Sequence, residues 1–140
     1  MAVPDQASLE IVGAAVLKAV PDGWGRAVLT VSAVAATMET RLAVEMLDGS
    51  VEGGESIDVD AQLACDDLRD RMYEDGVGTW YNATFVVTPD GGLEAEFDYD
   101  NPPFEGGGDA DLLENDQEAY PRDAEHLPAW HPSRESARRS

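Results

Sequence analysis

The chain has 140 residues, with 29 acidic and nine basic side chains and a formal net charge of −20 at pH 7. Because 43% of the residues are hydrophobic, a single domain of this length can bury a core, so the charge does not by itself indicate disorder. The electrostatic field of this net negative charge repels nucleic acid and anionic membranes, and it speeds the encounter with a basic partner. The composition therefore argues against binding to nucleic acid or membranes, while a solubility or halotolerance adaptation remains an alternative reason for the acids.

We expect one domain over residues 1–133, followed by a frayed tail over residues 134–140. Cys65 is the only cysteine, which excludes an intrachain disulfide, and its neighbours indicate a buried position on a helix. The first residues lack the basic segment of a secretory signal, and the apolar run at 11–20 is too short to span a bilayer. These features predict a cytoplasmic location.

The first part of the chain predicts one helix followed by strands. Apolar residues at helical spacing indicate a helix over residues 7–20, which the sequence Pro21-Asp22-Gly23 ends. Apolar and polar residues then alternate with strand period at 27–33 and again at 38–46. Residues 51–57 are compatible with a third strand that is interrupted by glycines.

Two further helices are predicted later in the chain. The first is expected from Ala61 to about Glu74, with Asp60 as its N-cap and Gly76 at its end. The second is a short helix over residues 111–118, preceded by a loop rich in glycine and acids. Its acidic loop lacks the periodicity that would place it in a core.

A β-hairpin over residues 80–99 is the clearest structural signal. Residues 80–87 alternate between apolar and polar, and Pro89-Asp90-Gly91-Gly92 supplies a turn that tolerates positive φ. Residues 93–99 then alternate again, so that one face must be buried and the other solvated. A slip of one residue would bury the four carboxylates of the second strand, which are Glu94, Glu96, Asp98 and Asp100.

The order of these elements predicts an α+β fold. It consists of an antiparallel β-sheet with helices packed on one face, in the order α-β-β-(β)-α-β-β-α. The chain contains no internal repeat and no linker long enough to separate two domains.

The motif search yields no catalytic or metal-binding constellation. The chain lacks a GxSxG sequence, a glycine-rich phosphate loop and a cysteine near a histidine in sequence. His126 and His131 stand alone without cysteine ligands, and the calcium-loop-like start at Asp48 has Val59 where the closing glutamate belongs. We therefore expect a protein without catalytic activity, metal or cofactor, which acts by binding.

The motifs along the chain resemble the YezG-like immunity (antitoxin) proteins that accompany polymorphic toxins in bacteria. The resemblance rests on the order of elements and on short sequences, sharpest between residues 80 and 130: Pro21-Asp22-Gly23-Trp24, the strand from Trp80 to Val87, Asp90-Gly91, Phe97-Asp98-Tyr99-Asp100, Pro121-Arg122 and Leu127-Pro128-Ala129-Trp130. It implies a cytoplasmic protein that binds and neutralises the toxic domain of a secreted effector made by the same cell. The resemblance implies a toxin domain as the partner, and we expect this toxin above all to be a nuclease or an NAD-consuming enzyme. It implies no catalytic residues in this chain.

The acidic strand and the loop that follows it form the predicted toxin interface. Acids here adjoin aromatic residues in a segment without core periodicity, and an apolar anchor among acids suits a tight complex with a basic partner. The predicted interface residues are Glu94, Glu96, Asp98, Asp100, Phe104, Glu105, Asp109, Asp111 and Tyr120. Reversal of Glu96 and Asp98 to lysine is expected to weaken binding more than reversal of Glu39 and Glu45.

Two rival hypotheses come from other functional classes. An enzyme could use a pair of acids in a cleft, which would require a desolvated carboxylate. A general interaction module or DNA mimic would use the same acids without a toxin partner. A basic toxin-like reading frame beside the gene would argue against both.

Overall fold

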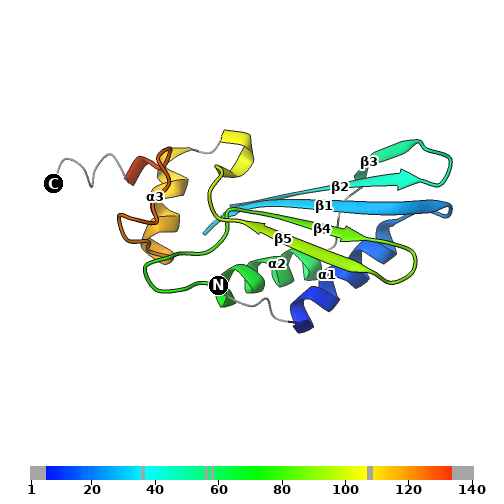
Figure 1. Cartoon of the computed structure of the whole chain (residues 1–140), viewed down its shortest axis with the longest axis horizontal. Helices are drawn as coiled ribbons and strands as arrows, with labels where there is room; N and C mark the ends of the chain where they lie inside the picture. The colour runs from blue at the N-terminus through cyan, green and yellow to red at the C-terminus, as the bar shows by residue number, and fades with distance from the viewer. Residues whose placement is uncertain (1–5, 36, 56, 58, 107–108, 134–140) are drawn as a thin grey trace.

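The structure, a computed structural model, describes residues 6–35, 37–55, 57, 59–106 and 109–133. The expected tail at 134–140 lies outside these residues. Figure 1 shows a single sheet with helices α1 (Gln6–Ala19) and α2 (Val59–Arg71) side by side on one of its faces. The α+β class, the antiparallel sheet and the order of elements agree with the prediction from sequence.

The sheet has five antiparallel strands in the spatial order β3-β2-β1-β4-β5. Their bounds are β1 Trp24–Val34, β2 Thr37–Met46, β3 Val51–Glu55, β4 Asn82–Val87 and β5 Leu93–Asp98. Helix α2 connects the outer strand β3 to β4, which pairs with β1 from Ala27↔Val87 to Ser32↔Asn82. β1 therefore lies at the centre, and β3 and β5 form the two edges.

The core lies between the sheet and the two helices. Strands β1, β2, β4 and β5 turn one row of apolar residues toward the helices, as the alternation in the sequence predicts, and α1 and α2 meet them with small and branched side chains. Trp80, which precedes β4, is fully buried and packs at 5.7 Å from Phe97, centroid to centroid. The buried helix residues include Val12, Ala15, Val16, Ala61, Ala64, Cys65 and Leu68.

Helix α2 departs from its predicted bounds at both ends. It begins at Val59, so Asp60 lies in its first turn and is not the N-cap; Asp58, at the preceding position, lies outside the described residues. It ends at Arg71 and not near Glu74, because Glu74 pairs with Gly78 in a tight turn instead of continuing the helix. Gly78 has φ +92° in this turn, a conformation that favours glycine.

The third strand and the last helix also differ in detail from the prediction. β3 ends at Glu55, and Ile57 is instead buried in the core. Helix α3 (Ala110–Ala119) is one residue longer at each end than predicted, and it lies beyond the strand ends, away from the face that α1 and α2 cover (Figure 1). A short 3-10 helix, η1 (Pro103–Gly106), occupies part of the predicted loop before it.

Candidate functional site

The sheet face opposite α1 and α2 is the main open surface, here called the open face. Among the residues that the structure describes, no helix lies across it, and η1 stands at one of its ends (Figure 1). The strand registers place small or polar side chains in rows across its middle. These central residues are Val28, Thr30, Ser32, Asn82, Thr84 and Val86, with Ala43 beside them on β2.

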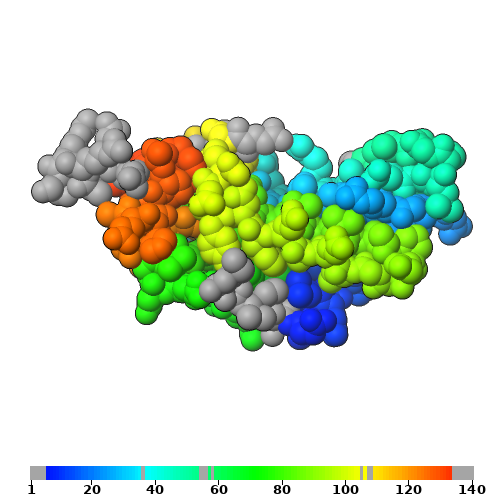
Figure 2. Space-filling model, viewed as in Figure 1, coloured from blue at the N-terminus to red at the C-terminus, as the bar shows by residue number. Residues whose placement is uncertain are grey.

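Three shallow grooves cover the open face, and Thr84 lines all of them. The first, of about 480 Å³, lies between Glu39 on β2 and Phe104 in η1. The second and third, of about 610 Å³ and 600 Å³, run along β5 beside Glu96. Figure 2 shows the molecule hollowed between the yellow residues around η1 and the blue-green hairpin of β2 and β3. The surface can therefore accept a protruding element of a partner.

Glu94 and Glu96 stand on β5 at the margin of the open face. Both side chains are exposed, and neither has a hydrogen-bond or ion-pair partner within the described part of the chain. β4 places Val86 and Thr84 directly opposite them. Two carboxylates next to small side chains can receive basic groups of a partner without first losing an internal ion pair.

Asp98 and Asp100 behave differently from these two glutamates. Asp98 accepts hydrogen bonds from the backbone N–H groups of Asp100 and Asn101 and from the Asn101 amide, at 2.9, 3.1 and 2.7 Å. Partial burial raises the pKa of Asp98, but these hydrogen bonds outweigh burial and hold the pKa below its ordinary value. Asp98 thus closes the turn after β5. Asp100 is exposed, and its carbonyl accepts a hydrogen bond from Trp130 Nε1 at 2.7 Å.

The predicted loop residues do not gather at one place. Phe104 is half-buried, has φ +57° and lines the first groove, so it lies beside the open face. Asp109 and Asp111 are exposed at the start of α3, where negative charge suits the helix N-terminus. Glu105 belongs to η1, and its side chain lies outside what the structure describes.

Tyr120 is engaged within the chain. Its ring lies 5.1 Å from the Arg69 guanidinium and 5.7 Å from the Tyr73 ring. Burial, followed by the neighbouring Asp70 carboxylate, raises the pKa of Tyr120 to about 12, so its hydroxyl stays protonated and donates to Asp70 at 3.2 Å. The structure therefore places Tyr120 at the junction of α3 with α2, away from Glu94 and Glu96.

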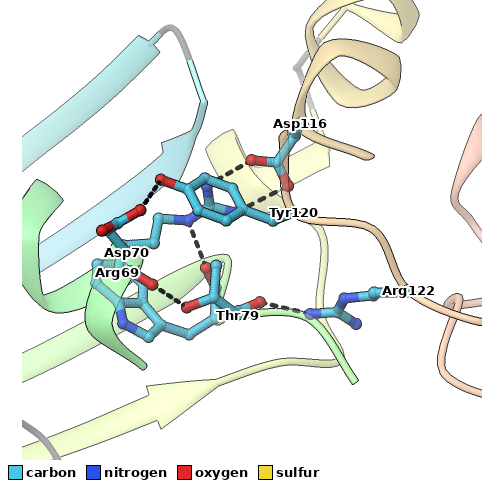
Figure 3. A network of polar contacts seen from close by, with 7 residues as sticks. Arg69, Asp70, Thr79, Asp116, Tyr120 and Arg122 are labelled. Carbon is cyan, nitrogen blue, oxygen red and sulfur yellow. Dashed lines mark hydrogen bonds and ion pairs between the residues drawn. The ribbon is translucent and has the colours of Figure 1, made fainter. Parts of the chain in front are cut away.

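A buried polar network holds α3 and the residues after it against the rest of the molecule (Figure 3). Arg69 on α2 forms a two-pronged ion pair with Asp116 on α3, and its Nε donates to the Trp80 carbonyl at 2.7 Å. Both side chains are almost fully buried. Arg122 donates to the carbonyls of Thr79 at 2.6 Å and Tyr99 at 3.0 Å. Because every charge here is paired or hydrogen-bonded, the network has a structural role.

The open face also carries cations, which the sequence pattern did not single out. Arg26 on β1 forms an ion pair with Glu45 on β2 at 2.6 Å, and Arg41 is exposed on β2. Glu39 and Glu45 lie on the same face as Glu96. Reversal of Glu39 and Glu45 to lysine therefore does not serve as a control at a distant surface. The β2 side of the face is thus mixed in charge, whereas the β5 side is acidic.

Candidate groups for nucleophilic or metal chemistry are sparse in the described structure. Burial, with Asp66 as a second cause, raises the pKa of Cys65 to about 12, so its thiol stays neutral. No group of three or more histidine, cysteine, aspartate or glutamate residues is arranged to hold a metal among the residues described. In the same residues, no helix is long and apolar enough to cross a membrane.

The central residues Thr30, Ser32, Asn82 and Thr84 were missed by sequence reasoning. These residues are the polar members of the alternating pattern in each strand. The strand order brings them together on one face, and the alternating pattern does not specify that order.

Comparison with known proteins adds nothing to this site, because the sequence matches no protein-family model and no curated protein.

Proposed function

We propose that this chain is a cytoplasmic immunity protein, which binds and neutralises the toxic domain of a secreted bacterial effector. The single observation that carries the proposal is the open sheet face with an acidic margin at Glu94 and Glu96. A fully built core leaves this face uncovered, and its two glutamates have no partner in the described part of the chain. The resemblance to YezG-like immunity proteins supplies the class of partner.

The charge distribution supports a basic partner. The net charge of −20 attracts a cationic protein over long range and raises the association rate. At close range, Glu94 and Glu96 along the third groove offer carboxylates to lysine or arginine, and Phe104 offers an apolar contact in the first groove. A nuclease with a basic substrate-binding surface fits this description, as does an NAD-consuming toxin with a basic site.

Co-expression tests the proposal directly. The chain is produced together with the toxin-like C-terminal domain encoded beside its gene, and both growth and co-purification are scored. The proposal predicts that the chain restores growth and that a stable complex is isolated. Toxicity that persists in the absence of a complex would contradict it and would favour an acidic interaction module without a toxin partner.

A further inference from the structure

Two backbone hydrogen bonds show which residues of β5 direct their N–H and C=O groups toward β4 and which direct them away from it. Thr88 N–H donates to the Gly92 carbonyl at 3.1 Å, in register with the β4–β5 pairs, and Ala33 N–H donates to the Tyr81 carbonyl at 2.9 Å, in register with the β1–β4 pairs. In an antiparallel ladder, hydrogen-bonded pairs alternate with pairs that are not bonded. The even-numbered residues of β4 therefore bond to β5, and its odd-numbered residues bond to β1.

It follows that β5 has an outer edge with unpaired backbone groups. Glu94, Glu96 and Asp98 direct their N–H and C=O groups inward to β4, whereas Leu93, Ala95 and Phe97 direct theirs outward. β5 is the last strand of the sheet among the described residues. The edge ends at Tyr99, because the carbonyl of Tyr99 accepts a hydrogen bond from Arg122 Nη1 at 3.0 Å.

The side chains of β5 add specificity to this edge. Glu94 and Glu96 project on the open face, while Leu93, Ala95 and Phe97 lie on the helix side and are only partly buried. A strand added antiparallel to this edge would place its own residues opposite Glu94 and Glu96 in pairs without backbone hydrogen bonds, where side chains approach most closely. Such a strand needs lysine or arginine on one face and apolar residues on the other.

The same charges argue against a second copy of this chain as the occupant. Two β5 strands paired antiparallel about Ala95 would set Glu94 of each copy against Glu96 of the other, and like charges directly opposite are destabilising. The other sheet edge is less suited to pairing. β3 contains Gly53 and Gly54, and its register with β2 shifts between Leu42 and Ala43.

We propose that the partner toxin domain adds a strand with alternating basic and apolar residues to the outer edge of β5, so that its cations meet Glu94 and Glu96. This inference rests on the proposed function and specifies how the partner is held. Main-chain hydrogen bonds to Leu93, Ala95 and Phe97 supply affinity, and the two glutamates select for a basic strand.

Amide hydrogen exchange followed by NMR tests the inference on the unmodified chain. The chain is labelled with nitrogen-15 and measured alone and in the complex purified from co-expression with the adjacent toxin domain. The expected result is an alternating change: the amides of Ala95 and Phe97 exchange quickly in the isolated chain and at least about 100-fold more slowly in the complex. The outer edge of β3 serves as the control and should change little.

Two other outcomes are distinguishable. A stable complex in which the amides of Ala95 and Phe97 exchange as fast as in the isolated chain overturns strand addition and leaves the proposed function standing. If no complex forms with the toxin domain, that result contradicts both the proposed function and strand addition. The paired variant Glu94→Lys with Glu96→Lys should weaken a strand-added complex by about 100-fold.

Discussion

At the scale of single residues, the charged side chains of this protein fall into two sets with different physics. Arg69 and Asp116 are almost fully buried and bonded to each other, so their charges depend on mutual compensation. Glu94 and Glu96 are exposed and have no partner in the described part of the chain. Substitution of Arg69 or Asp116 is therefore expected to lower the stability of the fold. Substitution of Glu94 or Glu96 is expected to weaken binding to the partner.

Asp116→Ala is predicted to be strongly destabilising. Removing one member of a buried ion pair leaves the Arg69 guanidinium without compensation, at a cost of about 3–5 kcal/mol in the free energy of unfolding. The control is Glu45→Ala, which breaks the half-exposed pair with Arg26 and should cost at most about 1 kcal/mol. Urea denaturation measures both, and equal losses would contradict a structural role for the buried pair.

Cys65 is predicted to be unreactive in the folded protein. Burial raises the pKa of its thiol to about 12, well above that of an exposed cysteine, so the reactive thiolate is scarce at pH 8. The sign of the shift also predicts a pH effect, since the stability it contributes is present at neutral pH and lost as pH rises toward 12. Labelling with a thiol reagent at pH 8, with and without urea, checks this; rapid labelling without urea would refute it.

At the scale of elements, alternation and turn residues in the sequence predicted the strands, the hairpin and the side of β5 that carries acids. They could do so because strand period and turn chemistry are local properties. The docking of α3 was beyond such reasoning, since Arg69 lies in a polar helical stretch and meets Asp116 only through the tertiary fold. The end of α2 was mispredicted for a similar reason, because the turn at Glu74–Gly78 is held by Arg122 from far along the chain.

Gly78→Ala tests how closely the segment after α3 is fitted to the turn that follows α2. An alanine Cβ at this position would lie 2.2 Å from Nε of Arg122, on a residue with φ +92°. The matched control is Gly91→Ala, which has φ +89° and nothing within 4 Å of the new Cβ. In both variants, placing alanine in the left-handed backbone conformation lowers the free energy of unfolding by about 1–2 kcal/mol. Gly78→Ala should cost a further ~1–3 kcal/mol for the collision in thermal or urea unfolding, and equal costs would contradict the close fit.

At the scale of the whole molecule, helices α1 and α2 build the core on one sheet face, and in the described part of the chain the other face stays open, where we propose that the partner binds. The net charge of −20 adds a long-range field to this face. The sequence predicted Phe104 and the acids of β5 as parts of a candidate interface, but not that Thr84 and Asn82 of β4 line the grooves beside them. Their assembly depends on strand order and on the path of the chain after β5.

The association rate with the toxin domain is predicted to fall with salt. Raising sodium chloride from about 50 to about 500 mM shortens the Debye length from roughly 14 Å to roughly 4 Å and screens the long-range attraction. The association rate constant should drop about tenfold or more, while the dissociation rate constant changes less. Stopped-flow mixing measures the association, and an association rate independent of salt would contradict a role for the charge in encounter.

The dissociation constant of the toxin complex for two charge-matched double variants tests the central claim most directly. Glu94→Lys with Glu96→Lys alters the acidic margin of the open face, whereas Glu10→Lys with Glu118→Lys makes the same net change at exposed positions on α1 and α3. Calorimetry should show the first pair weakening the complex by about 100-fold and the second by only a few-fold. Equal weakening by the two pairs would show that only the overall charge matters and would contradict binding at the open face.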